Sequence, residues 1–198
     1  NANDLPTPFK ALQMGSVWRA DRPQRGRFRQ FVQCDIDILG EPTCLAEIEL
    51  ILATTTLLGK LNFKDFKVRI NERRILKAMA SYSGFTEDQY DQVFIILDKM
   101  DKIGWDGVKA ELIESGYPEA NVEKYVTMFD EMEKAEDALA YLSEKLSGVL
   151  EEDVIENLRT IRTSVEATAA SQFQLVFDPT LVRGMSYYTG TIFEIEMA

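Results

Sequence analysis

Apolar and polar residues alternate along two segments near the N-terminus, residues 13 to 22 and 29 to 39. Alternation with a period of two predicts β-strands that are buried on one side. Pro23 and Gly26 stand between the segments and favour a turn, so the simplest interpretation is an antiparallel hairpin. One face of the second strand is expected to be core, and it carries Gln30, Val32, Cys34, Ile36 and Ile38.

The pattern becomes helical after the hairpin. Apolar side chains recur every three to four positions in residues 44 to 58, which predicts a helix that packs on the sheet. Residues 66 to 70 form a short β-rich run, and Asn71 is expected to cap a helix over residues 72 to 80. Further helices are predicted at residues 88 to 102, 105 to 115, 120 to 147 and 151 to 168.

The β pattern returns from residue 172, with a strand, a glycine-bearing loop and a second strand from residue 189 to the end. Strands on both sides of a helical stretch predict an α+β fold, an antiparallel β-sheet core interrupted by an all-helical insertion. We expect residues 1–86 and 169–198 to form the sheet domain and residues 87–168 the helical insertion. Because the chain stops inside a predicted strand, we expect it to be a fragment of a longer protein.

The net charge of −11 is unevenly distributed. Residues 85 to 160 carry 7 basic and 20 acidic side chains, which is the charge of either a solvated helical face or a docking surface. A pI near 4.6 argues against nonspecific coating of nucleic acid, which depends on phosphate neutralisation. A basic pocket for one polyphosphate stays possible.

Two further features limit the class of protein. No apolar run approaches the roughly 20 residues that span a bilayer, and the N-terminal residues show no signal peptide, so a soluble cytoplasmic protein is expected. With no histidine and only Cys34 and Cys44, neither a disulfide framework nor a metal site is expected.

The hairpin has an unusual second face. It gathers Arg29, Phe31, Gln33, Asp35 and Asp37, with Arg19 and Asp21 on the partner strand. An aromatic ring among guanidinium and carboxylate groups could hold a nucleotide, with the base on the ring and the phosphates on the arginines. The alternative is a surface hairpin whose arginines pair with its own aspartates and with the acidic helices.

A second candidate cluster is LVRGMSYYTGTIFE, residues 181 to 194. Arg183 precedes a glycine that allows close backbone approach, and Tyr187 and Tyr188 each offer a hydroxyl on an apolar ring. Ordinary packing of the two tyrosines is the alternative interpretation.

Three stretches together resemble one family. RADRPQRGRFRQFVQCDIDILG, residues 19 to 40, resembles motif 2 of class II aminoacyl-tRNA synthetases in its histidyl form, and KVRINERRIL, residues 67 to 76, resembles the segment after it. LVRGMSYYTGTIFE resembles the signature peptide of the histidyl-tRNA synthetases. The helical middle is similar in position to the insertion domain of that family.

The resemblance implies a ligase that uses ATP with Mg²⁺ to form histidyl-adenylate and then charges the histidine tRNA. Family members are homodimers, and motif 1, which forms their interface, is not found in this chain. Two alternatives stay open. One is a catalytically silent paralogue such as the regulatory subunit of ATP phosphoribosyltransferase, and the other is a module that binds ATP alone.

The resemblance also implies roles for individual residues. The catalytic pair is Arg19 and Arg183, expected on opposite sides of the α-phosphate and converging across a single β-sheet. The remaining ATP contacts are Asp21 at the adenine edge, Arg27 at the distal phosphates and Phe31 stacked on adenine. Histidine is expected to contact Gln33 at its α-amino group, Asp37 and Tyr188 at its imidazole, and also Arg183 and Tyr187.

The chain departs from the family pattern in several places. Met185 and Ser186 replace the usual Leu-Asp before the tyrosines, and Asp21 and Asp37 stand where many members have glutamate. The substrate loop, the glycine-rich second signature, motif 3 and an anticodon-binding domain are not found either. We therefore expect this chain alone to carry an incomplete active site.

Overall fold

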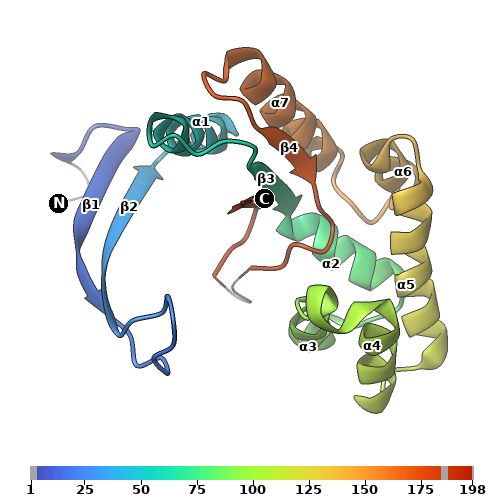
Figure 1. The fold of residues 1–198 in the computed structure, drawn as a ribbon. Helices are drawn as coiled ribbons and strands as arrows, with labels where there is room; N and C mark the ends of the chain where they lie inside the picture. The colour runs from blue at the N-terminus through green and yellow to red at the C-terminus, as the bar shows by residue number, and fades with distance from the viewer. Residues whose placement is uncertain (1–3, 184–186, 198) are drawn as a thin grey trace.

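The computed structural model describes residues 4–183 and 187–197. Strands β1 (Phe9–Trp18) and β2 (Gln30–Leu39) form the predicted antiparallel hairpin, with Phe9 opposite Leu39 and Trp18 opposite Gln30. This hairpin is a two-stranded sheet of its own, and its turn end stands apart from the rest of the molecule (Figure 1).

A second sheet has three strands. Strand β3 (Lys67–Glu72) lies in the middle, β4 (Gln174–Phe177) pairs with it in parallel, and β5 (Thr191–Glu196) pairs with it antiparallel. The α+β class is confirmed, whereas the expectation of one antiparallel sheet is wrong. A parallel neighbour is possible because the long helical excursion returns the chain to the end of the sheet where β3 starts.

One helix joins the two sheets, and the other helices follow β3 in the chain (Figure 1). Helix α1 (Leu45–Lys60) connects the hairpin to β3 and contacts α7 (Glu152–Thr168). Helix α2 (Arg73–Tyr82) leaves β3 and leads into the remaining helices. These are η2 (Glu87–Gln89), α3 (Tyr90–Leu97), α4 (Met100–Glu114), α5 (Glu119–Lys134) and α6 (Ala138–Lys145).

The start of α2 differs from the prediction. Its N-cap is Glu72, whose carboxylate accepts a hydrogen bond from the Arg74 amide at 3.1 Å. Asn71 is the fifth residue of β3 and is fully buried, and its side chain donates a hydrogen bond to the carbonyl of Leu181 instead of capping α2. The apolar side of α2 continues the core from the sheet into the helices through Ile75, Leu76 and Met79.

The predicted helix over residues 120 to 147 is also wrong in one respect, because it is two helices. Helix α5 ends at Lys134 and α6 begins at Ala138. Asp137 between them has extended backbone geometry, and its carboxylate accepts hydrogen bonds from the amides of Leu139 and Ala140. An aspartate in this position starts a new helix.

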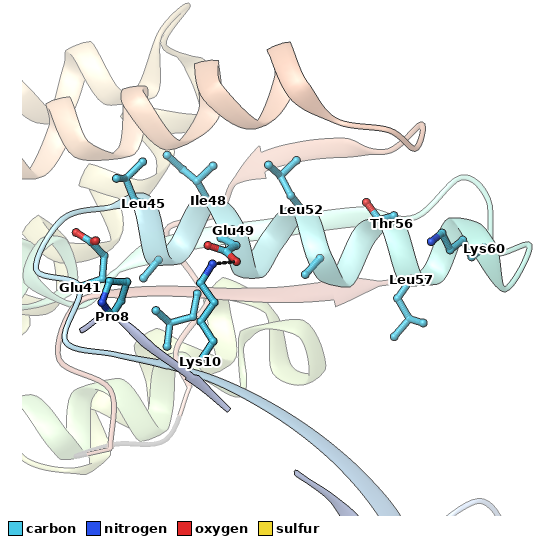
Figure 2. A pocket seen from close by; sticks show the side chains of 13 residues that line it. Pro8, Lys10, Glu41, Leu45, Ile48, Glu49, Leu52, Thr56, Leu57 and Lys60 are labelled. Atoms are coloured by element: carbon cyan, nitrogen blue, oxygen red, sulfur yellow. Dashed lines mark hydrogen bonds and ion pairs between the residues drawn. The ribbon is translucent and has the colours of Figure 1, made fainter. Parts of the chain in front are cut away.

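The apolar face of the hairpin was expected to be core, and this expectation is wrong. Most side chains on it are exposed, Val32 to 69% and Met14 to 75%, whereas Ile38 beside α1 is half-buried. Helix α1 lies beside only one end of the hairpin, where Lys10 and Glu49 form an ion pair at 2.5 Å (Figure 2). No described helix combines the length and the low polarity needed to cross a membrane.

Candidate functional site

The polar face of the hairpin brings three of the predicted site residues together. The guanidinium carbon of Arg19 lies 5.0 Å from the centre of the Phe31 ring, and its Nη2 donates to Gln33 Oε1 at 3.4 Å. The strand register explains the openness of this face. Gly15 stands opposite Gln33, and nothing lies within 4 Å of the place where its Cβ would be.

The flanking residues extend this face. Gln33 Nε2 donates to Asp35 Oδ2 at 2.5 Å, and Asp37 lies further along β2, exposed and opposite Ala11. In the turn, Arg29 Nε donates to the carbonyl of Asp21 at 3.2 Å. Arg27 is exposed there, with its amide bonded to the carbonyl of Gln24.

The arginines of the hairpin are not neutralised by carboxylates. Among the described residues, no ion pair within 4.0 Å involves Arg19, Arg22, Arg25, Arg27 or Arg29. The alternative of a self-paired surface hairpin is therefore not supported by the geometry. An unneutralised group of guanidiniums in an otherwise acidic chain concentrates positive potential where an anion can bind.

The second cluster lies at the three-stranded sheet. Arg183 Nη2 is 3.5 Å from Glu194 Oε1, and both residues line a cavity of about 170 Å³ together with Arg69. The rings of Tyr187 and Tyr188 meet edge to face with their centres 5.1 Å apart. Tyr187 is strongly exposed, whereas Tyr188 lines a different cavity together with Glu72, Arg74 and Thr191. Met185 and Ser186 lie outside the described residues.

The two clusters belong to different sheets, but the end of the hairpin approaches the second cluster, because Ile38 of β2 and Tyr188 line the same cavity. Arg19 directly follows β1 of the hairpin and Arg183 lies in the segment before β5, and β2 and β5 are not hydrogen-bonded to each other. Among the described residues, the cavity that Arg183 lines does not include Arg19. The expectation of a single sheet carrying both arginines is therefore wrong, and their convergence and individual roles stay predictions.

The cavity between the hairpin and α1 is not part of the candidate site. It measures about 640 Å³ and is lined mainly by apolar side chains of α1, including Leu45, Ile48 and Leu52 (Figure 2). None of the predicted site residues lines it. The part of the chain that the structure describes also brings together no three cysteine, aspartate or glutamate side chains that could hold a metal ion.

Sequence reasoning missed the residues that support Arg183. Arg69 in β3 donates from Nε to Asp178 Oδ2 at 2.6 Å. Burial alone would lower the pKa of Arg69, but the hydrogen bond and charge of Asp178, with Asp101 and Glu196, outweigh it and raise the pKa overall. The available signal was Arg69 between the two apolar residues Val68 and Ile70 of a β-rich run.

Solved structures with a similar fold include a histidyl-tRNA synthetase and a related protein. Histidyl-tRNA synthetase from Nostoc sp. PCC 7120 superimposes with a TM-score of 0.80 at 29% identity, covering 99% of this chain and 46% of that one. A Bacillus halodurans C protein described as an ATP phosphoribosyltransferase regulatory subunit/histidyl-tRNA synthetase gives a TM-score of 0.77 at 20% identity, covering 99% and 50%. In fold, the chain is thus of the synthetase type.

The sequence comparisons define the family. The family profile described as histidyl-tRNA synthetase matches residues 2–196, so the chain belongs to the histidyl-tRNA synthetase family. Histidine–tRNA ligase of Leifsonia xyli is 44% identical over 196 residues, covering 97% of this chain and 45% of the relative. The corresponding protein of Flavobacterium johnsoniae is 40% identical, covering 98% and 41%. The chain spans less than half the length of these curated relatives.

Proposed function

We propose that the full-length protein activates histidine with ATP and transfers the histidyl group to the 3′ end of its tRNA. The observation that carries the proposal is the family match over residues 2–196. The open hairpin face with Arg19, Phe31 and Gln33 supports it, because an aromatic ring beside guanidiniums that no described carboxylate neutralises suits a nucleoside triphosphate.

The first step depends on electrostatic stabilisation of its transition state more than on proton transfer. A carboxylate oxygen of histidine attacks the α-phosphorus of ATP, pyrophosphate leaves, and histidyl-adenylate forms. The nucleophile is already an anion, so no general base is required. Two anions approach each other and charge builds on the phosphoryl oxygens, so fixed cations stabilise the transition state more than the separated reactants. In the second step a terminal ribose hydroxyl of the tRNA attacks the acyl carbon, loses its proton and displaces AMP.

We assign the nucleotide to the hairpin. Adenine would stack on Phe31 with Asp21 at its edge, in the place now taken by the guanidinium of Arg19. Arg19 would then turn to the α-phosphate, and Arg27 in the turn would contact the distal phosphates. Arginine suits these contacts because its planar fork stays charged and donates in pairs.

We assign the histidine substrate to the boundary between the two clusters. Gln33 would bind the α-amino group, and Asp37 with Tyr188 would bind the imidazole. Tyr187 would complete the histidine contacts, and Arg183 would face the α-phosphate opposite Arg19. This arrangement requires the three-stranded sheet to lie beside the hairpin, and the cavity lined by both Ile38 of β2 and Tyr188 supports it.

Other participants follow from the proposed reaction. Mg²⁺ would enter with ATP as the Mg–ATP substrate, and the histidine tRNA would be the acceptor. We also propose that the full-length protein is a homodimer that works in the cytoplasm, where tRNA is charged. Residues 87–168 would form an insertion domain beside the tRNA, with few phosphate contacts because residues 85 to 160 are so acidic.

The test is histidine-dependent ATP–pyrophosphate exchange by the full-length protein. Arg183→Ala is expected to lower its rate by about 10²- to 10³-fold, the usual cost of losing one transition-state electrostatic contact. Arg162→Ala is the matched control, since Arg162 is exposed on α7 and pairs only locally with Glu166 at 3.0 Å. Near-normal exchange by the Arg183 variant would refute the assignment.

A histidine-binding regulatory paralogue is the second candidate function. The specific observation in its favour is the fold shared with the Bacillus halodurans protein. Such a paralogue would bind histidine in calorimetry without catalysing exchange. A module for ATP alone would bind ATP with the same affinity whether histidine is present or not.

A further inference from the structure

The backbone that leads to Arg183 is fastened to β3. Asn71 Nδ2 donates to the carbonyl of Leu181 at 3.0 Å, and the amide of Asp178 donates to the carbonyl of Ile70 at 2.9 Å. Arg69 holds the side chain of Asp178 at the same time. Since Leu181 is also buried, the chain two residues before Arg183 has little freedom.

Asn71 is well suited to this task. It is 0% exposed, and its Oδ1 accepts from the amide of Glu72 at 2.8 Å, so both ends of the side-chain amide are bonded. A buried amide without partners would be costly, whereas this one fixes two backbone groups at once. The backbone carrying Arg183 is therefore set by residues more than a hundred positions earlier in the sequence.

The remaining freedom of Arg183 lies in its side chain. With the backbone fixed, the direction of the guanidinium depends on rotation about its side-chain bonds, and the side chain is 53% exposed. The partner that limits this rotation is Glu194 Oε1, 3.5 Å from Nη2. Such a half-exposed ion pair adds little to stability, so its main effect is on orientation.

The position of Glu194 is itself well defined. It lies in β5 directly opposite Arg69 of β3, in a ladder that also pairs Asn71 with Ile192. Its side chain is one-third exposed and lines the same cavity of about 170 Å³ as Arg183. Because β5 is paired with β3, the Glu194 carboxylate has a defined position from which it can orient the Arg183 guanidinium.

We propose that Glu194 is a positioning residue for Arg183, orienting the guanidinium on a backbone that Asn71 holds in place. This inference rests on the proposed function, in which Arg183 faces the α-phosphate. Glu194 need not touch the substrate. A small displacement of the guanidinium would weaken its contact with the transition state while leaving substrate binding largely intact.

The experiment compares Glu194→Gln and Glu196→Gln in the full-length protein. Glu196 is the matched control, because it lies two residues further along β5 and is 3.9 Å from Arg69. In histidine-dependent pyrophosphate exchange, E194Q is expected to lower kcat by about 10- to 100-fold with KM for ATP and histidine nearly unchanged. E196Q is expected to match the wild type, and active-site titration corrects each rate for the folded fraction.

A double-mutant cycle separates positioning from folding. If Glu194 acts through Arg183, E194Q added to R183A should cause no further loss, whereas a structural role would lower the activity of both backgrounds equally. Normal kcat in E194Q, an additive effect in R183A or an equal loss in E196Q would each overturn the inference. Failure of the proposed function is recognised separately, because then the wild type shows no exchange or R183A retains it.

Discussion

The hydroxyl oxygen of Tyr125 is buried without a hydrogen-bond partner among the described residues, which lowers the stability of the fold. The residue is 0% exposed, and its ring packs edge to face against Phe85 and Phe129. Burial raises the pKa of this hydroxyl far above its ordinary value, so it stays neutral at every working pH. The ring stabilises the core, and the oxygen does not.

Tyr125→Phe is therefore expected to raise the free energy of unfolding by about 1 kcal/mol, because it removes an unbonded polar group and keeps the ring. Urea denaturation followed by circular dichroism measures the change. Tyr125→Ala is the companion variant and should lose about 3–5 kcal/mol through the cavity it leaves. A destabilised Tyr125→Phe protein would mean that the hydroxyl has a partner after all.

Individual residues of the candidate site differ in how far the sequence could predict them. Arg19, Phe31 and Gln33 lie on one strand pair, so alternation places them on one face, and the structure agrees. Asn71 contacts a carbonyl 110 positions away, and Glu194 acts across a ladder that no local pattern specifies. Local periodicity does not encode such long-range pairing.

At the scale of elements, Asp137 decides where a helix begins. The side chain of Arg159 and the amides of Ala140 and Leu139 all donate to its carboxylate and lower its pKa. A lowered pKa means that Asp137 stabilises the folded state at neutral pH. This contribution is lost as the pH falls through the folded-state pKa, below the ordinary range of aspartate.

Asp137→Ala is expected to cost about 1 kcal/mol at pH 7, chiefly through the lost N-cap of α6. Asp137→Asn should cost less, because asparagine also caps helices and only the half-exposed pair with Arg159 is lost. Thermal unfolding of the three proteins from neutral to strongly acid pH measures both effects. The gap between wild type and Asp137→Ala should narrow in acid, and a gap that widened there would contradict the cap.

The hairpin shows which property of an element a pattern can predict. Alternation and the turn residues predict an antiparallel hairpin, which β1 and β2 confirm, but β1 begins and ends four residues earlier than predicted and the pattern did not specify the register. The burial of a face depends on what packs against it, and the alternating sequence contains no information on that partner. Alternation therefore identifies correctly which side chains form the apolar face, but it does not predict that this face is largely exposed in this chain.

At the scale of the whole molecule, three arginines join the sheet to the helices. Arg69 lies 3.8 Å from Asp101 of α4, and the guanidinium of Arg73 is 4.7 Å from the ring centre of Phe94 in α3. Arg74 donates to Glu151, just before α7, at 3.2 Å. The arginines of residues 67 to 76, one in β3 and two at the start of α2, thus contact different parts of the helical region.

The exposed face of the hairpin should make the isolated 198-residue chain prone to association. Exposed apolar side chains gathered on one face bind hydrophobic dyes and other molecules. We expect the chain to bind anilinonaphthalene sulfonate, and Met14→Lys with Val32→Thr to reduce the fluorescence several-fold. Leu61→Lys, at an exposed site beyond α1, is the control and should change it little. Equal dye binding by all variants would contradict a patch on the hairpin.

The parallel pairing of β3 with β4 has a consequence for the order in which the chain folds. Arg69 and Asp178, which join across this pair, are 109 positions apart in the sequence. Closing so long a loop is entropically unfavourable, while the helices between them form through local contacts. The helices must therefore assemble early and shorten the effective distance between β3 and β4. The three-stranded sheet, with Arg183 beside it, is completed last.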